Sequence, residues 1–575
     1  MKYLHLLRLP LAAMLLSCAV NSPAVLSPAA SGSPEVLPEP RIISSKGAVG
    51  LAAAKPKAAA TSSVAAKPAA AATKLVVAKP LDATLATPAV PKLAVVTPAA
   101  LKDGIISGIR FGRFGEVAVY KPKAPTHAVL FLSGDGGWNQ GVIEMAQVLY
   151  RKDYLVIGID MRRYLAAVGK GKERCFYPPA ELQGLAQVVQ KRIGMRHYLR
   201  PILVGYSSGA TLAYGALAAA PPGTFDGAIS IGFCPDAVSK KPMCKGEGLS
   251  TRPHQNKAGG KSQGYDLLPY KQLPALWVAL HGRSDQTCPY KQTETFVTAV
   301  GNARLVGLDM VGHGFGVQKR WQVPFERSIR DVTAAAFVRA PQINKEHTTG
   351  LSADAPVPSP LDRGDVDLPL VEIKPPLDAP LTDYLAILVS GDGGWAGLDR
   401  DIANSLADAG VPVIGLDSLQ YFWSERTPEN GASDLQLLLT YYLKDWHKQK
   451  AIVIGFSFGA EVLPFMVARL SPASKAKVPL VALVSPSKLA TFEFEIAQLF
   501  GPSDTPSGQP VAPELAKLKD IRRLCIYGSS DHHALCPQLH DGTQVIKLPG
   551  GHRLGGSGEV IASAVLQAIG QPVAK

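Results

Sequence analysis

The sequence predicts an α/β fold in two tandem copies, each a mainly parallel sheet with helices on both faces. Two observations carry this prediction. Short β-branched runs alternate with helix-length amphipathic segments, and the runs ILVG, IVIG and LWVAL are continuously apolar, as expected of parallel strands buried on both sides. A set of sequence blocks also occurs twice in the same order. Such a repeat indicates an internal duplication.

The length and composition of the chain favour a globular protein with more than one domain. Its 575 residues exceed what one hydrophobic core accommodates, and 47% of them are apolar against 18% charged. The formal net charge of +14 favours anionic partners such as a membrane surface. Nucleic-acid binding is not expected, because the basic residues are not interleaved with aromatic ones.

The first residues have the pattern of an export signal. Lys2 and Arg8 supply positive charge, and the apolar run that follows Arg8 is too short to span a bilayer. We therefore expect residues 1–18 to be a signal peptide. The Leu-Leu-Ser-Cys tract that ends at Cys18 resembles a lipoprotein cleavage site, so Cys18 is also a candidate for lipidation.

Two segments of biased composition divide the rest of the chain. Residues 19–100 are dominated by Ala, Pro, Lys, Ser and Val and lack aromatic residues, so they cannot bury enough apolar surface to offset the cost of ordering. We interpret them as a disordered tether. Pro and Asp accumulate again at residues 341–378, which predicts a linker. The two α/β domains are then expected at residues 101–340 and 379–575.

Five sequence blocks occur in both predicted domains. The first is an apolar strand that runs into SGDGGW, at residues 128–138 and 386–395. A strand that ends in Asp follows, and then a strand that runs into a Gly-flanked serine. The remaining pairs supply an Asp and a His. The four later pairs are YLVIGID and VPVIGLD, ILVGYSSGA and IVIGFSFGA, LWVALHGRSDQTCP and LCIYGSSDHHALCP, and DMVGHGFG and KLPGGHRLGG.

The Gly-flanked serine of each copy has the setting of a nucleophile elbow. GFSFG at residues 455–459 follows an apolar strand and opens a predicted helix, as does GYSSG at residues 205–209. The glycines allow the backbone to approach closely, and the helix N-terminus favours developing negative charge. A Gly-rich turn without chemistry has the same pattern, so the partners of the serine decide between the two interpretations.

Each serine has candidate catalytic partners later in its own copy. A serine hydroxyl needs a base, and the base needs a carboxylate that orients it. In both copies an Asp and then a His follow predicted strands, in the order Ser, Asp, His that α/β-hydrolases use. Taken alone, each Asp could cap a turn and each His could be an ordinary loop residue, but the recurrence of all three residue types in both copies favours catalysis. The predicted triads are Ser457, Asp531 and His552, and Ser207, Asp285 and His313.

The SGDGGW turns predict the remaining part of the site. A Gly-rich turn after a central strand lets backbone N–H groups point at a developing oxyanion, together with the N–H of the residue after the nucleophile. Only the main chain matters for this role. The predicted donors are the backbone N–H groups of Asp392 and Phe458 in the second copy, and of Asp135 and Ser208 in the first.

No metal or cofactor is expected. The histidines do not cluster at ligand spacing, and no phosphate-binding GxxxxGK[ST] motif occurs. Asp160 and Asp417 end strands but precede the serine of their copy, so we interpret them as turn-forming residues.

The cysteine count is compatible with an oxidising compartment. Without Cys18 six cysteines remain, and Cys525 and Cys536 are the two in the second copy, so they would have to pair with each other if they pair within it. Buried free thiols are an equally good interpretation. The other four are Cys175, Cys234, Cys244 and Cys288.

Several tracts of the chain resemble one protein family. SGDGGW followed by VIGLDS, the tract YFWSERTPE and the elbow IGFSFGAEVLPF are together similar to the VirJ/AcvB family of periplasmic bacterial virulence proteins. The resemblance covers nearly all of the chain after residue 100. The signal, the Ala/Pro-rich stretch and the two related domains match the longer, AcvB-type layout. The first copy lacks the YFWSERTPE tract and has MRRYLAAVGKGKERCFYPP instead.

The resemblance implies a function in lipid metabolism. It implies a periplasmic enzyme that hydrolyses aminoacylated phosphatidylglycerol, chiefly the lysyl ester, with links to membrane-lipid homeostasis, acid tolerance and type IV secretion. The nucleophile of the family falls on Ser457. The first copy, which lacks one of the matching tracts, is expected to be secondary.

A site for a lysyl group should contain an acidic side chain, and Asp392, Glu425 and Glu461 are the candidates. Two other functions stay open. One is a non-catalytic periplasmic protein that supports type IV secretion through protein contacts, and the other is a carboxylesterase of broad specificity. A fluorophosphonate probe separates the first of these from an enzyme, because a scaffold without an activated serine does not react.

Overall fold

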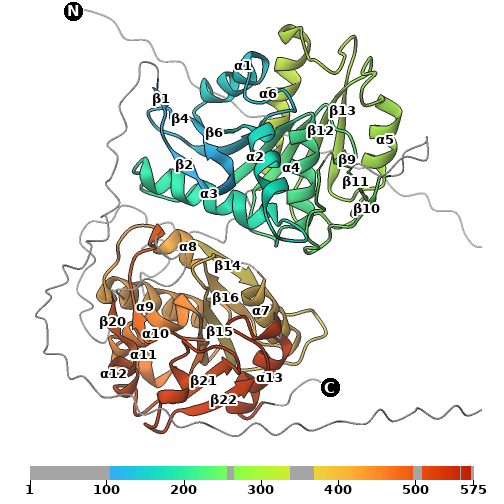
Figure 1. Cartoon of the computed structure of the whole chain (residues 1–575). Coiled ribbons are helices and arrows are strands. Elements are labelled where there is room, and N and C mark those ends of the chain that lie inside the picture. The colour runs from blue at the N-terminus through green and yellow to red at the C-terminus, as the bar shows by residue number, and fades with distance from the viewer. Residues whose placement is uncertain are drawn as a thin grey trace, which may run out of the picture. The chain divides into compact units, whose positions relative to one another are not determined.

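Two mainly parallel sheets organise the described part of the chain, as the computed structural model shows (Figure 1). The signal peptide predicted at residues 1–18, the tether predicted at residues 19–100 and most of the linker predicted at residues 341–378 lie outside the described residues. The described ranges are 104–237, 239–254, 264–336, 368–395, 397–496, 508–556 and 558–571.

The first sheet has eight strands in the order β1-β4-β6-β5-β7-β8-β12-β13. The strands from β6 to β13 in this order are parallel, while β4 pairs antiparallel with β6 and β1 pairs antiparallel with β4. Their bounds are β1 Ile105–Ile106, β4 Ala118–Tyr120, β5 His127–Leu132, β6 Tyr154–Ile159, β7 Pro201–Tyr206, β8 Gly227–Ile231, β12 Trp277–Gly282 and β13 Ala303–Leu308.

Helices cover both faces of the first sheet. Residues of α1 and α6 form one buried cluster with one set of strand side chains, and residues of α2, α3, α4 and α5 form the other. Along β5, Leu130 belongs to one cluster while Val129 and Phe131 belong to the other, which is the alternation of a strand buried on both sides. The helices are α1 Gln140–Tyr150, α2 Met161–Lys170, α3 Pro178–Arg192, α4 Ser208–Ala219, α5 Tyr290–Thr298 and α6 Gln318–Ala335.

The second sheet repeats this plan with seven strands in the order β14-β16-β15-β17-β18-β21-β22. All neighbours are parallel except β14, which pairs antiparallel with β16. Their bounds are β14 Leu370–Ile373, β15 Tyr384–Val389, β16 Val413–Leu416, β17 Lys450–Phe456, β18 Leu480–Val484, β21 Arg522–Gly528 and β22 Gln544–Leu548.

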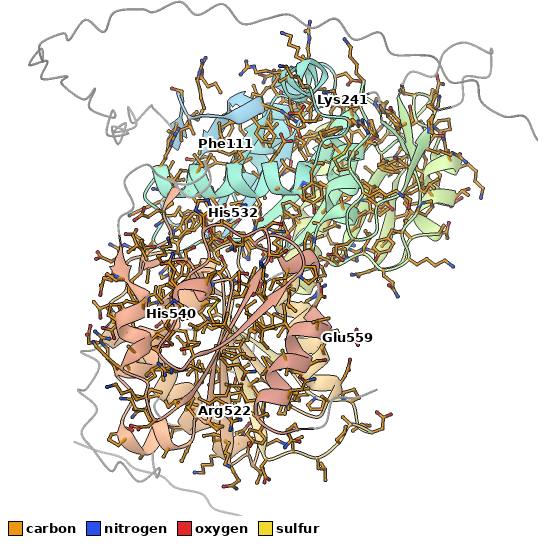
Figure 2. All side chains as sticks on the ribbon, turned by 60° about the horizontal axis from the view of Figure 1, so that its bottom comes forward. Phe111, Lys241, Arg522, His532, His540 and Glu559 are labelled. Carbon is orange, nitrogen blue, oxygen red and sulfur yellow. A yellow bond between two sulfur atoms is a disulfide. The ribbon has the colours of Figure 1, made fainter. Side chains whose placement is uncertain are left out.

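The second sheet is also covered on both faces. Residues of α7 and α13 pack in one buried cluster, and residues of α9, α10 and α12 pack in the other. In Figure 2 exposed side chains such as Arg522, His540 and Glu559 project from this domain. The helices are α7 Leu398–Asp408, α8 Ser418–Tyr421, α9 Pro428–Asp445, α10 Phe458–Ala468, α11 Pro472–Ala476, α12 Val511–Ala516 and α13 Gly558–Ala568.

Short elements decorate the two sheets. Three small antiparallel sheets consist of strands of two or three residues, and short turns of 3-10 helix occur in loops of the described ranges. The strands are β2 Arg110–Phe111, β3 Gly115–Glu116, β9 Asp236–Ala237, β10 Thr251–Pro253, β11 Tyr265–Leu267, β19 Leu489–Ala490 and β20 Gln509–Pro510, and the 3-10 turns are Gly112–Phe114, Cys536–Gln538 and Leu554–Gly556.

The fold confirms the prediction of two tandem α/β copies. One difference concerns the predicted linker at residues 341–378, because β14 lies inside it and extends the second sheet. The run Leu370–Ile373 is a four-residue edge strand beside Pro- and Asp-rich sequence, so its composition does not distinguish it from the linker. None of the described helices is long and apolar enough to cross a membrane.

Candidate active sites

Ser207 and Ser457 each sit at a sharp turn between a central strand and a helix. Ser207 joins β7 to α4 with φ 56° and ψ −120°, and Ser457 joins β17 to α10 with φ 51° and ψ −118°. Positive φ is a strained conformation for a residue with a side chain, and it persists where the surrounding structure enforces it. Both serines therefore have the backbone geometry of a nucleophile elbow.

The glycines around each serine are required by close backbone contacts. A Cβ added at Gly205 would lie 2.1 Å from the carbonyl oxygen of Gly209, and one added at Gly455 would lie 2.5 Å from that of Gly459. A Cβ at Gly459 would lie 2.1 Å from the carbonyl oxygen of Val389 in the neighbouring strand. The turn is thus packed against the sheet with no room for a side chain.

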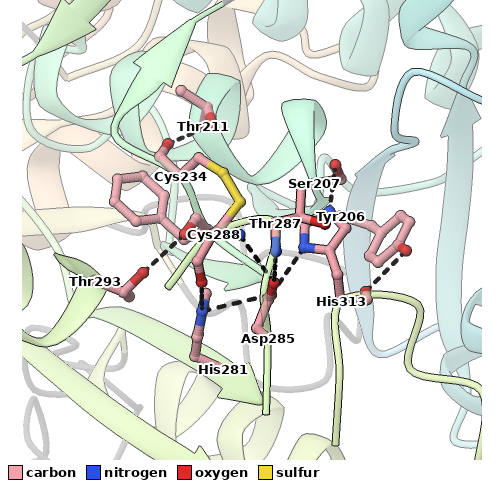
Figure 3. Close-up of a disulfide and its surroundings, with 11 residues drawn as sticks. Tyr206, Ser207, Thr211, Cys234, His281, Asp285, Thr287, Cys288, Thr293 and His313 are labelled. Atoms are coloured by element: carbon pink, nitrogen blue, oxygen red, sulfur yellow. Dashed lines mark hydrogen bonds and ion pairs between the residues drawn. A yellow bond between two sulfur atoms is a disulfide. The ribbon is translucent and has the colours of Figure 1, made fainter. Parts of the chain in front are cut away.

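The first predicted triad forms a continuous chain of hydrogen bonds, which Figure 3 shows. Ser207 Oγ lies 2.9 Å from His313 Nε2, and His313 Nδ1 lies 2.8 Å from Asp285 Oδ2. The Asp285 side chain is fully buried, and 19% of the His313 side chain is exposed. This geometry allows the imidazole to take the serine proton while Asp285 holds its Nδ1–H.

The second predicted triad has the same geometry and is more open. Ser457 Oγ lies 2.8 Å from His552 Nε2, and His552 Nδ1 lies 2.8 Å from Asp531 Oδ2. The His552 side chain is 43% exposed, while only 4% of the Asp531 side chain is. The backbone N–H of His533 donates a hydrogen bond to Asp531 Oδ1 at 3.2 Å. His532, which Figure 2 labels, and His533 follow Asp531 in the chain and are both exposed.

The SGDGGW turns lie directly against the serines. A Cβ at Gly134 would lie 3.1 Å from the Cβ of Ser207, and one at Gly391 would lie 3.6 Å from the Cβ of Ser457. The following residues, Asp135 and Asp392, are therefore close enough for the oxyanion role predicted for their N–H groups, which stays a prediction. Asp135 is exposed and Asp392 is partly buried.

The other predicted oxyanion donors begin helices. Ser208 is the first residue of α4 and Phe458 is the first residue of α10. A backbone N–H in the first turn of a helix has no partner within that helix, so it can donate a hydrogen bond to an anionic ligand. Asp160 and Asp417 serve a different purpose, because each caps a helix: Asp160 accepts from Arg163 N, and Asp417 accepts from Gln420 N.

The six cysteines of the two domains form three disulfides. Two of them hold the loops that carry the triad acids. Cys288, three residues after Asp285, is bonded to Cys234 in the loop after β8, and the backbone N–H groups of Thr287 and Cys288 both donate to Asp285 Oδ1 at 2.9 Å. The pairs are Cys175–Cys244, Cys234–Cys288 and Cys525–Cys536.

The second acid loop is closed differently from the first. Cys536, five residues after Asp531, is bonded to Cys525 within β21 of the same sheet. Cys288 and Cys536 are each followed by proline in the repeated block, so they correspond to each other in sequence. The partner of Cys288 is thus in a loop after β8, whereas the partner of the corresponding Cys536 is in strand β21.

His281 is a residue of the first site that the sequence did not reveal. It is fully buried at the end of β12, its Nε2 donates to the carbonyl oxygen of Cys288 at 2.8 Å, and it lies 3.5 Å from Asp285 Oδ2. Burial lowers the pKa of His281, which favours the neutral imidazole. Tyr527 occupies the corresponding place in the second copy, so the comparison of the repeats gave no signal.

Potential metal ligands lie together in the first site. Among the described residues, Asp285, Cys288 and His313 are the group of three whose ligand atoms come within 4.8 Å of one another. The sulfur of Cys288 is in a disulfide, and the other two residues are bonded to each other in the triad. The donor set therefore does not fit a metal.

Two of the three acidic candidates for a cationic substrate lie near the second serine. Glu461 is in the first turn of α10, and its Oε1 accepts a hydrogen bond from Ser487 N at 3.2 Å. Burial raises the pKa of Glu461 to about 7, and the charge of Asp392 adds to this rise. Burial also raises the pKa of Asp392, while the nearby His552 lowers it. Glu425 is exposed in the loop between α8 and α9, outside this pair.

Comparison with known proteins finds one family. The model of the bacterial virulence protein VirJ matches residues 126–224 and 383–572, which together are half of the chain and include both serines. The search of curated proteins gave no match.

Solved structures with partial similarity are esterases and related hydrolases. The esterase domain of a Rhodothermus marinus protein has 15% identity and a TM-score of 0.27, and the match covers 40% of this chain and 99% of that one. The α/β serine hydrolase XC6422 of Xanthomonas campestris has 16% identity and a TM-score of 0.25, with 35% of this chain and 88% of that one covered.

Proposed function

Because the chain belongs to the VirJ family of bacterial virulence proteins, we propose that it is a periplasmic serine hydrolase that cleaves the aminoacyl ester of lysyl-phosphatidylglycerol or a related aminoacylated lipid. One observation carries the enzymatic part of the proposal: the chain of hydrogen bonds from Ser457 through His552 to Asp531. A protein that acts only through protein contacts has no use for this arrangement.

The reaction proceeds by acyl transfer to Ser457. His552 takes the hydroxyl proton as the Ser457 oxygen bonds to the ester carbonyl carbon, and backbone N–H groups hold the oxyanion. The bond to the glycerol oxygen then breaks, and His552 gives its proton to that oxygen, so phosphatidylglycerol leaves. Water, deprotonated by His552, attacks the acyl-enzyme and releases the free amino acid and the serine.

The acidic pair supports a cationic acyl group. Asp392 follows the turn that lies against Ser457, and Glu461 is four residues after Ser457 in α10. The charge of each carboxylate raises the free energy of the other unless a cation lies between or beside them. The two ammonium groups of a lysyl ester would supply that charge, so Asp392 and Glu461 are the substrate-binding residues of this proposal.

The openness of the second site supports a substrate held in a membrane. The His552 side chain is 43% exposed, so the reacting atoms are near the surface, where the headgroup of a lipid can reach them without leaving the bilayer. The net charge of +14 favours an anionic membrane surface as the partner of the whole chain. Type IV secretion components remain proposed partners through the family alone.

The experiment is lysine release by the purified full-length protein from vesicles that contain lysyl-phosphatidylglycerol. We expect Ser457→Ala to abolish release. The control Thr298→Ala, which removes an exposed hydroxyl group in α5, should leave release intact. Undiminished release by Ser457→Ala overturns the proposal. Absence of fluorophosphonate labelling at both serines would favour the non-catalytic interaction protein, and equal rates on uncharged lipid esters would favour a broad carboxylesterase.

A further inference from the structure

The position four residues after the serine differs in charge between the two sites. Glu461 occupies it in α10, and Thr211 occupies it in α4. Both side chains are on the first turn of the helix that the serine precedes. The two copies therefore keep the triad and change the residue beside it.

Both residues contact the same loop position. The Ser207 N–H donates to the carbonyl oxygen of Ile231, and the Ser457 N–H donates to that of Val484, so these two strand ends correspond. Three residues farther on in each loop are Cys234 and Ser487. Thr211 Oγ1 donates to the carbonyl oxygen of Cys234 at 2.7 Å, whereas Glu461 Oε1 accepts from the N–H of Ser487 at 3.2 Å.

The first site fills this corner with neutral groups. Cys234 is in the disulfide with Cys288, and Figure 3 shows this disulfide and Thr211 on one side of Ser207 and His313. Thr211 is buried, with 1% of its surface exposed. The counterpart of Asp392 differs as well, since Asp135 is exposed whereas Asp392 is partly buried. A cationic acyl group at this corner would meet the Thr211 hydroxyl in place of a carboxylate that could offset the loss of its hydration.

A cavity with both polar and apolar lining lies beside the first triad. It has a volume of about 170 Å³ and adjoins Tyr206, which precedes the serine, and Phe315, which follows His313 by two residues. Val142, Met145 and Trp321 supply further apolar lining, and the carboxylate of Glu144, which also lines it, accepts a hydrogen bond from Gln140. Asn139 and Gln318 add polar lining, so the cavity offers room for an acyl chain but does not itself select its charge.

We propose that the two active sites divide their substrates by charge: the first site hydrolyses carboxylic esters with an uncharged acyl group, and the second hydrolyses esters of cationic amino acids. The second half rests on the function proposed above, and the first half does not. At the first site Ser207 bonds to the acyl carbon as His313 takes its proton, the alcohol leaves with that proton, and water releases the carboxylic acid.

The experiment compares two esters with the full chain and its serine variants. p-Nitrophenyl butyrate represents an uncharged acyl group, and lysine methyl ester represents a cationic one. We expect Ser207→Ala to lower kcat/KM for the butyrate at least tenfold while the lysine ester is hydrolysed within threefold of the normal rate. Ser457→Ala should show the reverse pattern, and labelling by a fluorophosphonate at the remaining serine shows that each variant is folded.

The two proposals fail in different ways. Butyrate hydrolysis that survives Ser207→Ala within twofold overturns the division of substrates and leaves the lysyl-ester function standing. Lysine-ester hydrolysis that survives Ser457→Ala overturns the lysyl-ester function. Loss of both activities in either single variant overturns the division as well, because separate sites should fail separately.

A change of the charged residue tests the specificity directly. Glu461→Thr places the first-site residue in the second site, and Glu461→Gln removes the charge at nearly the same size. We expect both to raise the KM for lysine methyl ester and to lower the ratio of its kcat/KM to that of the butyrate at least tenfold, measured in the Ser207→Ala background. An unchanged ratio overturns the role of Glu461.

Discussion

The Glu461 carboxylate accepts a hydrogen bond from the backbone N–H of Ser487, 3.2 Å away, in a place where burial raises its pKa to about 7. The charge of Asp392 adds to the rise, and the pKa of Asp392 is itself raised by burial. The second site therefore contains a carboxyl group, that of Glu461, whose ionisation changes near neutral pH. A bound cation favours its ionised form, which couples substrate binding to proton release.

The first prediction concerns the stability of the second domain. In the unfolded chain Glu461 loses its proton near pH 4.5, while the folded form keeps it to about pH 7. Between these values the folded state holds more protons, so the free energy of unfolding decreases as pH rises. We expect Glu461→Gln to remove this decrease. The free energy of unfolding of the variant minus that of the normal chain should therefore be larger at pH 8 than at pH 5 by about 1–3 kcal/mol.

Urea unfolding at the two pH values measures this difference. The matched control is Glu425→Gln, because Glu425 is exposed and should not change the pH dependence. If Glu461→Gln and Glu425→Gln show the same difference between pH 5 and pH 8, the raised pKa of Glu461 is not present in solution.

The sequence predicted the fold and the partners of each serine because both depend on order along the chain. In parallel α/β sheets the carboxyl ends of the strands meet at one edge, so an Asp and a His after later strands approach a serine after an earlier one. The internal repeat then argued against a chance occurrence of these residues, since Asp285 and Asp531 occur in matched blocks. The structure adds the distances that join them to His313 and His552.

What the sequence did not predict depends on contacts between loops. The partner of Cys288 could not be read from spacing, because its counterpart Cys536 bonds within its own strand-loop unit while Cys288 bonds to another loop. His281 was missed for a related reason, since a histidine inside a strand gives no sign that it abuts a carboxylate. The edge strand at Leu370–Ile373 was hidden in Pro- and Asp-rich sequence.

The second prediction concerns the disulfide Cys234–Cys288 as a positioning element. Cys288 donates its backbone N–H to Asp285, so the disulfide limits the motion of the loop that holds the acid against His313. We expect Cys234→Ser with Cys288→Ser to lower kcat/KM of the first site at least tenfold.

The control for this change is Cys175→Ser with Cys244→Ser, which removes a disulfide of the same domain that does not touch the acid loop. Hydrolysis of p-nitrophenyl butyrate in the Ser457→Ala background measures the activity of the first site alone. Equal losses of kcat/KM in the two double variants would assign Cys234–Cys288 a purely structural role.

The third prediction concerns the acid of the second triad. Asp531→Asn keeps the shape of the side chain but presents an amide to His552 Nδ1, which favours the wrong imidazole tautomer. We expect kcat for lysine release to fall on the order of 10³–10⁴-fold with little change in KM. His532→Asn, an exposed neighbour, is the matched control. A loss below tenfold for Asp531→Asn would mean that this carboxylate does not orient the base.

The fourth prediction concerns the backbone packing that holds the elbow. A Cβ at Gly459 would lie 2.1 Å from the carbonyl oxygen of Val389, and neither the strand nor the helix can move without displacing Ser457. Gly459→Ala should therefore destabilise the second domain by at least about 3 kcal/mol, at the upper end of overpacking costs. Gly393→Ala is the control for stability, since a Cβ there has no neighbouring atom within 4 Å. Urea unfolding followed by tryptophan fluorescence compares them, and equal midpoints would show that the elbow can relax around a side chain.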